Sequence, residues 1–378
     1  MTIVPFNKPY MTGKELWYIS QAHHAGQLAG DGTYTKKCHT WLQKKHDCSK
    51  ALLTHSCTAA LEMSAILADV KEGDEVIMPS YTFVSTANAF VLRGAVPVFI
   101  DIRPDTLNLD ETLVESAITD KTRAIVPVHY AGVGCEMDTL QNIAQKHQLL
   151  LIEDAAQGLM ATYKDKPLGS FGDLSCFSFH ETKNIISGEG GALIINNSRF
   201  TEEAEIIREK GTNRSQFFRG QVDKYTWIEK GSSYLPGELI AAFLYAQLEE
   251  AEQIIASRLK VWDYYHELLE PLEKEGKLRR PIIPKECQHN GHMYYILLEN
   301  LDTRTRLIEY LKAEGIYSVF HYVPLHSSPA GEHYGRVHGS MTITNQLSDN
   351  LVRLPLFPLL QFSEIERIVS LIKIFLEG

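Results

Sequence analysis

The chain reads Ser178-Phe179-His180-Glu181-Thr182-Lys183-Asn184 directly after a short apolar run, Leu174–Phe177. The segment Ser187-Gly188-Glu189-Gly190-Gly191 follows, and its glycines form a turn in which no side chain crowds the lysine. Upstream, a second apolar run, Leu149–Ile152, ends in Glu153-Asp154-Ala155-Ala156-Gln157. Short apolar runs of this kind are typical of buried strands. The sequence therefore predicts a lysine and an aspartate at the ends of two buried strands.

This pair of residues is what a pyridoxal phosphate (PLP) site requires. Lys183 could hold the cofactor aldehyde as a Schiff base and, once released, move a proton to and from the substrate carbon. Asp154 could keep the pyridine nitrogen protonated, so that the ring accepts electrons. The alternative is a surface lysine after an edge strand and an aspartate that caps a helix. Either residue alone would favour this alternative, whereas the two in this order favour PLP.

Further residues could complete such a site. Gln157 could bond the ring hydroxyl, although a polar residue at a helix N-terminus is the plainer reading of it. The turn Ser56-Cys57-Thr58-Ala59-Ala60 follows the predicted strand Ala51–His55 and opens a helix, where free amides bind phosphate. The Thr58 hydroxyl and Ser178 could add hydrogen bonds, and Phe83 could stack on the ring. Each of these has a competing structural interpretation. The turn at Ser56–Ala60 could be an ordinary strand-to-helix turn without a ligand, Ser178 could be a buried structural serine, and Phe83 could be an aromatic residue of the core.

Composition limits the class of protein. A chain of 378 residues exceeds the usual size of one core, so two domains are expected. The net charge of −10 disfavours nucleic acid and anionic membranes as partners. The six cysteines form no CxxC pairs, and the N-terminus shows no secretion signal. No apolar run is long enough to span a bilayer. We expect a cytoplasmic protein.

Strands and helices alternate over the first two-thirds of the chain, which predicts an α/β fold with a mostly parallel sheet. Seven strands are expected, at Ala51–His55, Glu75–Pro79, Val96–Ile102, Ala124–His129, Leu149–Glu153, Leu174–Phe179 and Ala192–Ile195. Residues 1–250 should form a large PLP-binding domain with an N-terminal arm, and residues 251–378 a small α+β domain. The small domain should contain strands Met293–Leu298 and Tyr317–Val323 and helices Thr303–Glu314 and Ser363–Leu376.

Taken together, the chain resembles the DegT/DnrJ/EryC1/StrS family of PLP-dependent sugar aminotransferases over almost its whole length. The similar segments are Ile3–Phe6, Gly73–Phe83, Ala95–Ile102, Pro127–Gly132, Glu153–Gln157 and Ser178–Asn184. The resemblance implies a type I aminotransferase fold and a homodimer with active sites at the subunit interface. It implies L-glutamate as amino donor and a nucleotide-linked 4-keto-6-deoxyhexose, dTDP-4-dehydro-6-deoxy-D-glucose, as acceptor. It supports the roles given to Lys183, Asp154, Gln157, Ser178, Phe83 and the amides at Cys57 and Thr58.

The chain departs from the family pattern at two places. Ser56-Cys57-Thr58 replaces the common Ser-Gly-Thr of the phosphate turn. Gly231-Ser232-Ser233-Tyr234-Leu235 replaces Gly-x-Asn-x-Arg, whose asparagine reaches the phosphate in the neighbouring subunit, so Ser233 would have to make that contact. In the C-terminal domain, the resemblance favours His326 as a residue that meets the sugar or its diphosphate.

Other functions are less well supported. A dinucleotide oxidoreductase should show G-x-G-x-x-G, and Gly188-Glu189-Gly190-Gly191 lacks that spacing. PLP sugar dehydratases of the same family carry histidine where this chain has Lys183, and a non-catalytic sugar-binding regulator would be expected to lose Lys183 or Asp154. A 3-keto-sugar aminotransferase stays open, since the residues fix neither the nucleotide nor the ketone position. No metal is expected, because His23-His24 and His321…His326 have no carboxylate at ligand spacing.

Overall fold

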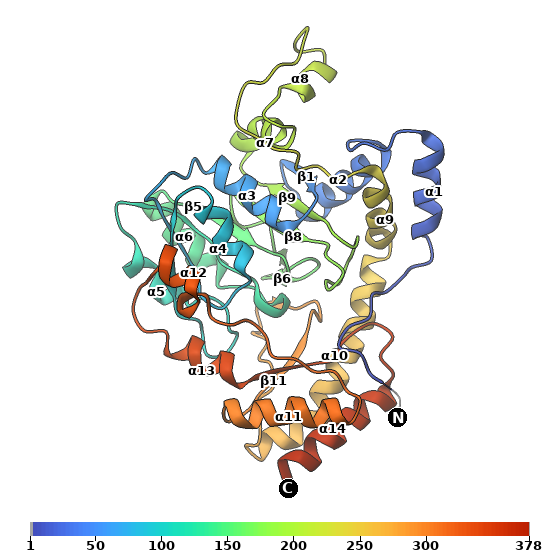
Figure 1. Ribbon diagram of the computed structural model, residues 1–378, viewed down its shortest axis with the longest axis vertical. Helices are drawn as coiled ribbons and strands as arrows, with labels where there is room; N and C mark the ends of the chain where they lie inside the picture. Colours follow the sequence, from blue (N-terminus) through green and yellow to red (C-terminus); the bar gives the residue numbers. More distant parts are fainter. Residues whose placement is uncertain (1–2, 378) are drawn as a thin grey trace.

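The computed structural model describes residues 3–377. A body built around one large sheet carries a smaller part below it, and the long helix α10 runs from one to the other (Figure 1). The helices are α1 (Glu15–Ala25), α2 (Thr33–His46), α3 (Cys57–Leu67), α4 (Val84–Val91), α5 (Glu111–Ala117), α6 (Met137–His147), α7 (Thr201–Arg208), α8 (Arg214–Phe218), α9 (Glu238–Glu249), α10 (Ala251–Lys274), α11 (Leu301–Ala313), α12 (Pro329–Tyr334), α13 (Thr342–Asn350) and α14 (Phe362–Glu377).

The large sheet has the strand order β1-β9-β8-β5-β4-β2-β3-β12. Its strands are β1 (Lys50–Thr54), β2 (Glu75–Pro79), β3 (Val96–Ile100), β4 (Thr122–Ile125), β5 (Leu150–Asp154), β8 (Leu174–Ser178), β9 (Gly191–Ile195) and the two-residue β12 (Arg336–Val337). All neighbours are parallel except β9, which is antiparallel to both β1 and β8. This confirms the predicted mostly parallel sheet of seven strands, to which the C-terminal region adds the short β12.

Both faces of the sheet are covered, and this explains the unbroken apolar runs. In β5, Ile152 packs into the core that includes residues of α3 and α4, whereas its neighbour Leu151 packs into the core that includes α5 and α6. Because successive residues point to opposite faces, β5 delivers Glu153 to one side and Asp154 to the other. The helices α2 and α9 complete a third core beside β1 and β9.

The smaller part packs α10, α11 and α14 against a two-stranded antiparallel sheet of β11 (Tyr294–Leu297) and β13 (Leu351–Leu354). The predicted strand Tyr317–Val323 is wrong: in this segment only Val319 pairs, through one bridge to Arg353. The segment does not extend the sheet because residues 319–322 line a cavity instead. Val4 bridges Ile316 and lies in the core of the smaller part.

Two short features complete the fold. A second small sheet joins β6 (Thr162–Tyr163), β7 (Lys166–Pro167) and β10 (Cys287–Gln288). The excursion that contains α8 projects from the top of the body (Figure 1). Within residues 3–377, no helix has the length and apolar character needed to span a membrane.

Candidate functional site

A cavity of about 670 Å³ lies where β5 and β8 end and the C-terminal segments meet the body. Its wall contains Asp154, the last residue of β5, and Lys183, which follows β8 by one short turn. The structure therefore brings together two strand ends that are far apart in sequence. Seven of the predicted site residues line this cavity: Cys57, Thr58, Phe83, Asp154, Gln157, Ser178 and Lys183.

Asp154 is buried and held in a fixed orientation. Thr86 Oγ1 donates to Asp154 Oδ2 at 2.7 Å, and the Ala156 amide donates to Oδ1 at 3.1 Å. Burial raises the pKa of Asp154, while the Thr86 hydrogen bond and the charge of Lys183 oppose the shift. A cation that approaches this carboxylate would relieve the cost of its burial, which is what a protonated pyridine nitrogen supplies.

Lys183 ends a compact loop in which its own amide donates to the His180 carbonyl at 2.9 Å. Its amine makes no hydrogen bond or ion pair with any of residues 3–377. Burial lowers the pKa of Lys183, and the charge of Asp154 only partly offsets this effect. A lysine that loses its proton more easily is a better nucleophile towards an aldehyde and a better proton carrier.

The turn before α3 has the features of a phosphate site. The Ser56 side chain caps the helix by accepting from the Ala59 amide at 3.1 Å. The amides of Cys57 and Thr58 donate to no described residue, so they are available at the positive end of the helix dipole. The strand behind the turn approaches closely, because a Cβ on Gly191 would lie 2.5 Å from the Cys57 nitrogen. Glycine at 191 therefore allows the turn to lie flat against β9.

The remaining predicted residues present polar and aromatic groups to the same space. Gln157 Oε1 accepts from the Ala131 amide at 2.7 Å, and its Nε2 donates to the Tyr322 hydroxyl at 2.9 Å. Phe83 is 56% exposed and its ring lies 6.4 Å from that of Tyr322, so one face is free to stack on a ligand. Ser178 Oγ accepts from the His180 amide at 3.4 Å.

Two predicted residues lie outside the cavity wall. Ser80 Oγ is 2.7 Å from His326 Nδ1 and also accepts from the His326 amide, so these contacts tie this histidine to the end of β2. His321, five residues earlier, is the histidine of this segment that reaches the cavity. Ser233 is exposed and pairs with Glu209 through a β-bridge beside the α8 excursion. In one subunit it is not a neighbour of Lys183.

The sequence did not predict several residues of the site. His292, Tyr322 and Arg353 line the wall and come from the C-terminal region, and Tyr322 accepts a hydrogen bond from Gln157. Thr86 is buried behind the wall and donates to Asp154. Thr86 lies three residues after Phe83 on the first turn of α4, where a helix that follows a strand faces the same edge of the sheet. No comparable signal marks Arg353, since it lies within a strand whose pairing the sequence did not predict.

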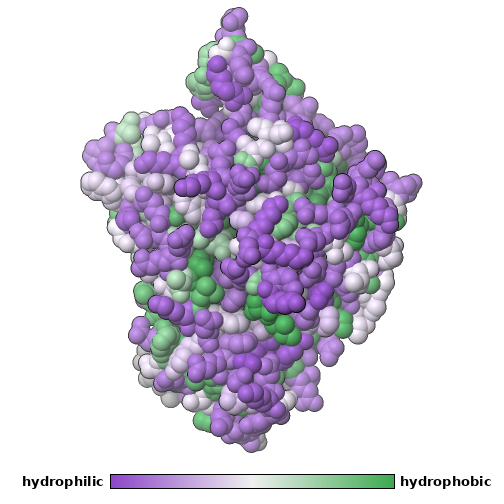
Figure 2. Space-filling view, turned by 180° about the vertical axis from the view of Figure 1, so that it is seen from behind, coloured by the Kyte–Doolittle hydropathy of each residue, from purple (hydrophilic) through white to green (hydrophobic). Residues whose placement is uncertain are grey.

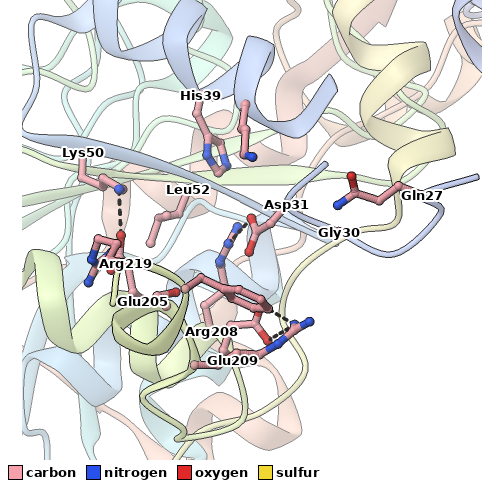
Figure 3. A pocket seen from close by; sticks show the side chains of 14 residues that line it. Gln27, Gly30, Asp31, His39, Lys50, Leu52, Glu205, Arg208, Glu209 and Arg219 are labelled. Atoms are coloured by element: carbon pink, nitrogen blue, oxygen red, sulfur yellow. Dashed lines mark hydrogen bonds and ion pairs between the residues drawn. The ribbon is translucent and has the colours of Figure 1, made fainter. Parts of the chain in front are cut away.

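A second cavity, of about 390 Å³, lies between the start of α2, the edge strand β1 and α7–α8 (Figure 3). Four of its cations are matched by carboxylates: Arg208 binds Asp31, Lys50 and Arg219 bind Glu205 at 2.7 and 2.6 Å, and Arg214 lies 3.4 Å from Glu209. The fifth, Lys36, is exposed to solvent. No cluster of three or more metal-ligating side chains occurs among residues 3–377.

Comparisons with known proteins agree with this geometry. The family model of the DegT/DnrJ/EryC1/StrS aminotransferases matches residues 9–373. The uncharacterized protein MJ1066 of Methanocaldococcus jannaschii is 37% identical over 331 residues, 85% of each chain. The spore coat polysaccharide biosynthesis protein SpsC of Bacillus subtilis is 28% identical and covers 99% of this chain and 97% of its own.

A solved structure gives the same result for the fold and the cofactor. Spr1654 from Streptococcus pneumoniae in its PLP form is 26% identical, with a TM-score of 0.89 over 100% of this chain and 99% of that chain. The same protein has a pyridoxamine phosphate (PMP) form. These likenesses confirm the predicted type I fold and PLP as the cofactor. The cavity fits PLP, since it offers an amine, a buried carboxylate that lacks a cation, and free amides at a helix N-terminus.

Proposed function

We propose that this chain, which belongs to the DegT/DnrJ/EryC1/StrS aminotransferase family, moves an amino group from L-glutamate to a nucleotide-linked 4-keto-6-deoxyhexose. The membership makes the protein a PLP-dependent sugar aminotransferase. The finer proposal names dTDP-4-dehydro-6-deoxy-D-glucose as acceptor and dTDP-4-amino-4,6-dideoxy-D-galactose and 2-oxoglutarate as products. The observation that supports amino-group transfer is the presence of Lys183 and Asp154 in the wall of one cavity, where neither forms an ion pair with any of residues 3–377.

The proposed roles follow from the contacts of each residue. When bound, PLP supplies an aldehyde that exchanges amines and a ring that accepts the electrons of a deprotonated carbon. Asp154, fixed by Thr86, would hold a proton on the ring nitrogen. Lys183 would bind the aldehyde at rest and carry the proton at the substrate carbon during each half of the reaction. Burial lowers the pKa of Lys183, which suits both tasks, because its amine must be free of its proton to act.

The rest of the cavity would position the cofactor. The amides of Cys57 and Thr58 and the Thr58 and Ser178 hydroxyls would bind the phosphate, as the helix N-terminus favours an anion. Gln157 would meet the ring hydroxyl with the second proton of its amide nitrogen, and Phe83 would cover the ring. His326 would act at the sugar only through a movement that frees it from Ser80.

The acceptor is named from resemblance. The sequence resembles that of dTDP-4-dehydro-6-deoxy-D-glucose transaminase, which serves the biosynthesis of enterobacterial common antigen. The similar protein SpsC is a protein of spore coat polysaccharide biosynthesis. We place the enzyme in the cytoplasm, where nucleotide sugars are made. The discriminating experiment is an assay of the purified enzyme with L-glutamate and a panel of nucleotide keto-sugars, with product structures determined by NMR. An amine at C3, or loss of oxygen without amination, would contradict the proposal.

We also propose that the enzyme is a homodimer. The α8 excursion exposes a group of large apolar side chains, Phe217, Phe218, Tyr225, Trp227 and Ile228. Green patches interrupt the hydrophilic surface of the projecting tip in Figure 2. Such a group on a projection is costly in water and is expected to be covered by another chain. The neighbouring Ser233 would then reach the phosphate in the partner's site. Light scattering that finds a fully active monomer at assay concentration would contradict this.

A further inference from the structure

His292 lies just before β11 and lines the cavity that also contains Lys183. It is 6% exposed, so its ring is largely enclosed by protein. Asn290 anchors this segment to the body, since its Nδ2 donates to the carbonyls of Gln157 and Leu159 at 2.7 and 2.8 Å. The Oδ1 of the same asparagine accepts from the His292 amide at 3.0 Å. The backbone of the histidine is therefore held in place by its neighbour.

A second asparagine fixes the orientation of the His292 ring and the position of its proton. Asn184, which directly follows Lys183, donates from Nδ2 to the Asn290 carbonyl at 2.9 Å. Its amide oxygen consequently faces His292, whose Nδ1 lies 2.8 Å away. An oxygen can only accept, so Nδ1 carries the proton and Nε2 presents a lone pair. Burial lowers the pKa of His292 well below its usual value, and the charge of Lys183 adds to this shift, so the ring stays neutral.

His129 shows what a structural histidine looks like in this fold. Its Nε2 lies 2.9 Å from Glu153 Oε2, and its Nδ1 accepts from the Cys135 amide at 3.3 Å. Both ring nitrogens are thus occupied within the protein. The Nε2 of His292, in contrast, makes no hydrogen bond with any of residues 3–377. His292 therefore brings to the cavity wall a largely enclosed acceptor that lacks a donor, which costs free energy until a donor arrives.

We infer that His292 Nε2 accepts a hydrogen bond from the Lys183 amine once that amine is released from the cofactor, and that this bond aims the amine at the substrate carbon. The inference rests on the proposed function, because it concerns the task given there to Lys183. The stem of a lysine is long and flexible, so its amine needs a fixed partner to keep one direction. A free amine has two hydrogens and one lone pair. A bond from one hydrogen to Nε2 restricts where the lone pair points, and a restricted direction favours proton transfer. His292 is thus a positioning residue and moves no proton itself.

His321 also reaches the cavity wall from the C-terminal region, but its surroundings differ. Its Nδ1 lies 2.8 Å from the Tyr130 hydroxyl. Among nearby charges, that of Arg353 lowers the pKa of His321 most. For His292 the largest effect of a charge comes from Lys183. This difference favours His292 as the acceptor for the amine.

Two substitutions separate the two nitrogens of the ring. His292→Gln places an amide oxygen near the position of Nε2 and loses the donor to Asn184, whereas His292→Asn keeps a donor near Nδ1 and offers no acceptor to Lys183. The PLP-loaded variants and the wild type are mixed with L-glutamate alone, and conversion of the cofactor to its amino form is followed by absorbance. We expect the rate constant at saturating L-glutamate to fall on the order of 10- to 100-fold in His292→Asn and by less in His292→Gln. The opposite ranking would mean that His292 only holds Asn184, and would overturn the inference.

An isotope effect locates the step that is lost. With L-glutamate deuterated at Cα, the isotope effect on this half-reaction should equal or exceed that of the wild type in His292→Asn, because transfer of that proton is the step that slows. The keto-sugar half-reaction should slow by a similar factor, since the same amine acts in both directions. A smaller isotope effect, or a loss confined to one half-reaction, would overturn the inference.

A measurement on the wild type examines the bond itself and does not need an active variant. In enzyme labelled with ¹⁵N-histidine, the His292 resonances are identified by their absence in either variant. The Nε2 resonance should move upfield when L-glutamate converts the PLP form to the PMP form, because this conversion frees the Lys183 amine to donate. An unchanged Nε2 resonance would contradict the inference.

The control is a histidine of the same segment. His289→Asn changes a residue that packs on Trp262, with ring centroids 4.3 Å apart, and that lies outside the cavity wall, so it should react like the wild type. A loss in His289→Asn as large as that in His292→Asn would show a general disturbance of the segment and overturn the inference. If the wild type fails with L-glutamate, the proposed donor is wrong, and the same comparison is made with the amino acid that it accepts.

Discussion

The two cavities of this protein use similar side chains in opposite ways. In the cavity between α2, β1 and α7–α8, Arg208, Lys50 and Arg219 each contact a carboxylate of the same chain (Figure 3). In the cavity at the ends of β5 and β8, Lys183 and Arg353 have no such partner among residues 3–377. Charges that are already paired hold elements together, whereas charges that are buried and unpaired are available to a ligand. The two cavities therefore differ in whether their buried and half-buried cations are paired within the chain.

Replacement of Lys183 tests this distinction with the largest expected effect. Lys183→Ala removes the one lysine amine that residues 3–377 contribute to the cavity wall, and we expect turnover to fall by at least on the order of 10,000-fold, as for loss of a nucleophile. Stability should change little, because the amine supports no contact within the protein. Mass spectrometry after borohydride reduction should find the cofactor on Lys183 in the wild type. An adduct on another lysine in the mutant would show that the assignment is wrong.

The adjacent residues Glu153 and Asp154 at the end of β5 allow a second comparison between a carboxylate that is bonded within the protein and one that is available to a ligand. Asp154→Asn removes the charge proposed to face the ring nitrogen, and the rate should fall on the order of 100-fold with a smaller effect on cofactor binding. Glu153 points to the other face, where it accepts from the amides of Gly169, Phe171 and Gly172 and pairs with His129 at 2.9 Å. Glu153→Gln should instead lower the free energy of unfolding, by about 3 kcal/mol, because the new side-chain NH2 group would face buried amides that now donate to a carboxylate oxygen. Kinetics and urea unfolding of both variants check the contrast, and near-normal turnover in Asp154→Asn would contradict it.

The sequence predicted the large sheet well, because its strands are buried on both faces and read as apolar runs bounded by turns. It failed in the smaller part, where pairing is decided by long-range contacts. Val319 and its neighbours have the composition of a strand but face the cavity, while β13 pairs with β11 across more than fifty intervening residues. The bridge from Val4 to Ile316 joins the two ends of the chain and has no local signal.

The candidate site shows the same limit. Lys183, Asp154 and the turn at Cys57 follow strands directly, so their convergence at one edge of the sheet could be predicted from order alone. Their chemical roles stay predictions. His326 and Arg353 could not be ranked from sequence, since which side chain of the C-terminal region enters the cavity depends on how that region packs against the body. Whether a buried charged side chain has an ion-pair partner can be known only from the folded structure, where all its neighbours are in place.

In the cavity between α2, β1 and α7–α8, where cations are paired with carboxylates, we expect a substitution to have a moderate effect on stability and none on catalysis. Glu205 accepts from Lys50 at 2.7 Å and from Arg219 at 2.6 Å, and both partners are partly exposed. Glu205→Gln should lower the free energy of unfolding by about 1–2 kcal/mol, because water can solvate the cations that are left. The loss should shrink at high salt, which screens such pairs. Steady-state kinetics should stay within about two-fold of the wild type. A large loss of turnover in the intact fold would mean that this cavity also serves the reaction.

His39 lines the same cavity, and we expect it to make stability depend weakly on pH. Its Nε2 accepts from the Leu53 amide at 2.8 Å, which only a neutral imidazole can do. Burial, helped by the charge of Arg208, lowers the pKa of His39 to about 3. The unfolded chain binds a proton here below about pH 6.5 and the folded protein does not, so stability is full above that pH and falls as the pH drops towards the folded pKa. Between about pH 7.5 and about pH 5.5 this histidine should cost about 1 kcal/mol. His39→Gln, whose amide oxygen can still accept from Leu53, should reduce the pH slope of urea unfolding by that amount, whereas His24→Gln on the exposed surface of α1 should not. An unchanged slope in His39→Gln would mean that His39 is charged in the folded protein, and that this cavity, like the one around Lys183, contains a cation without a partner.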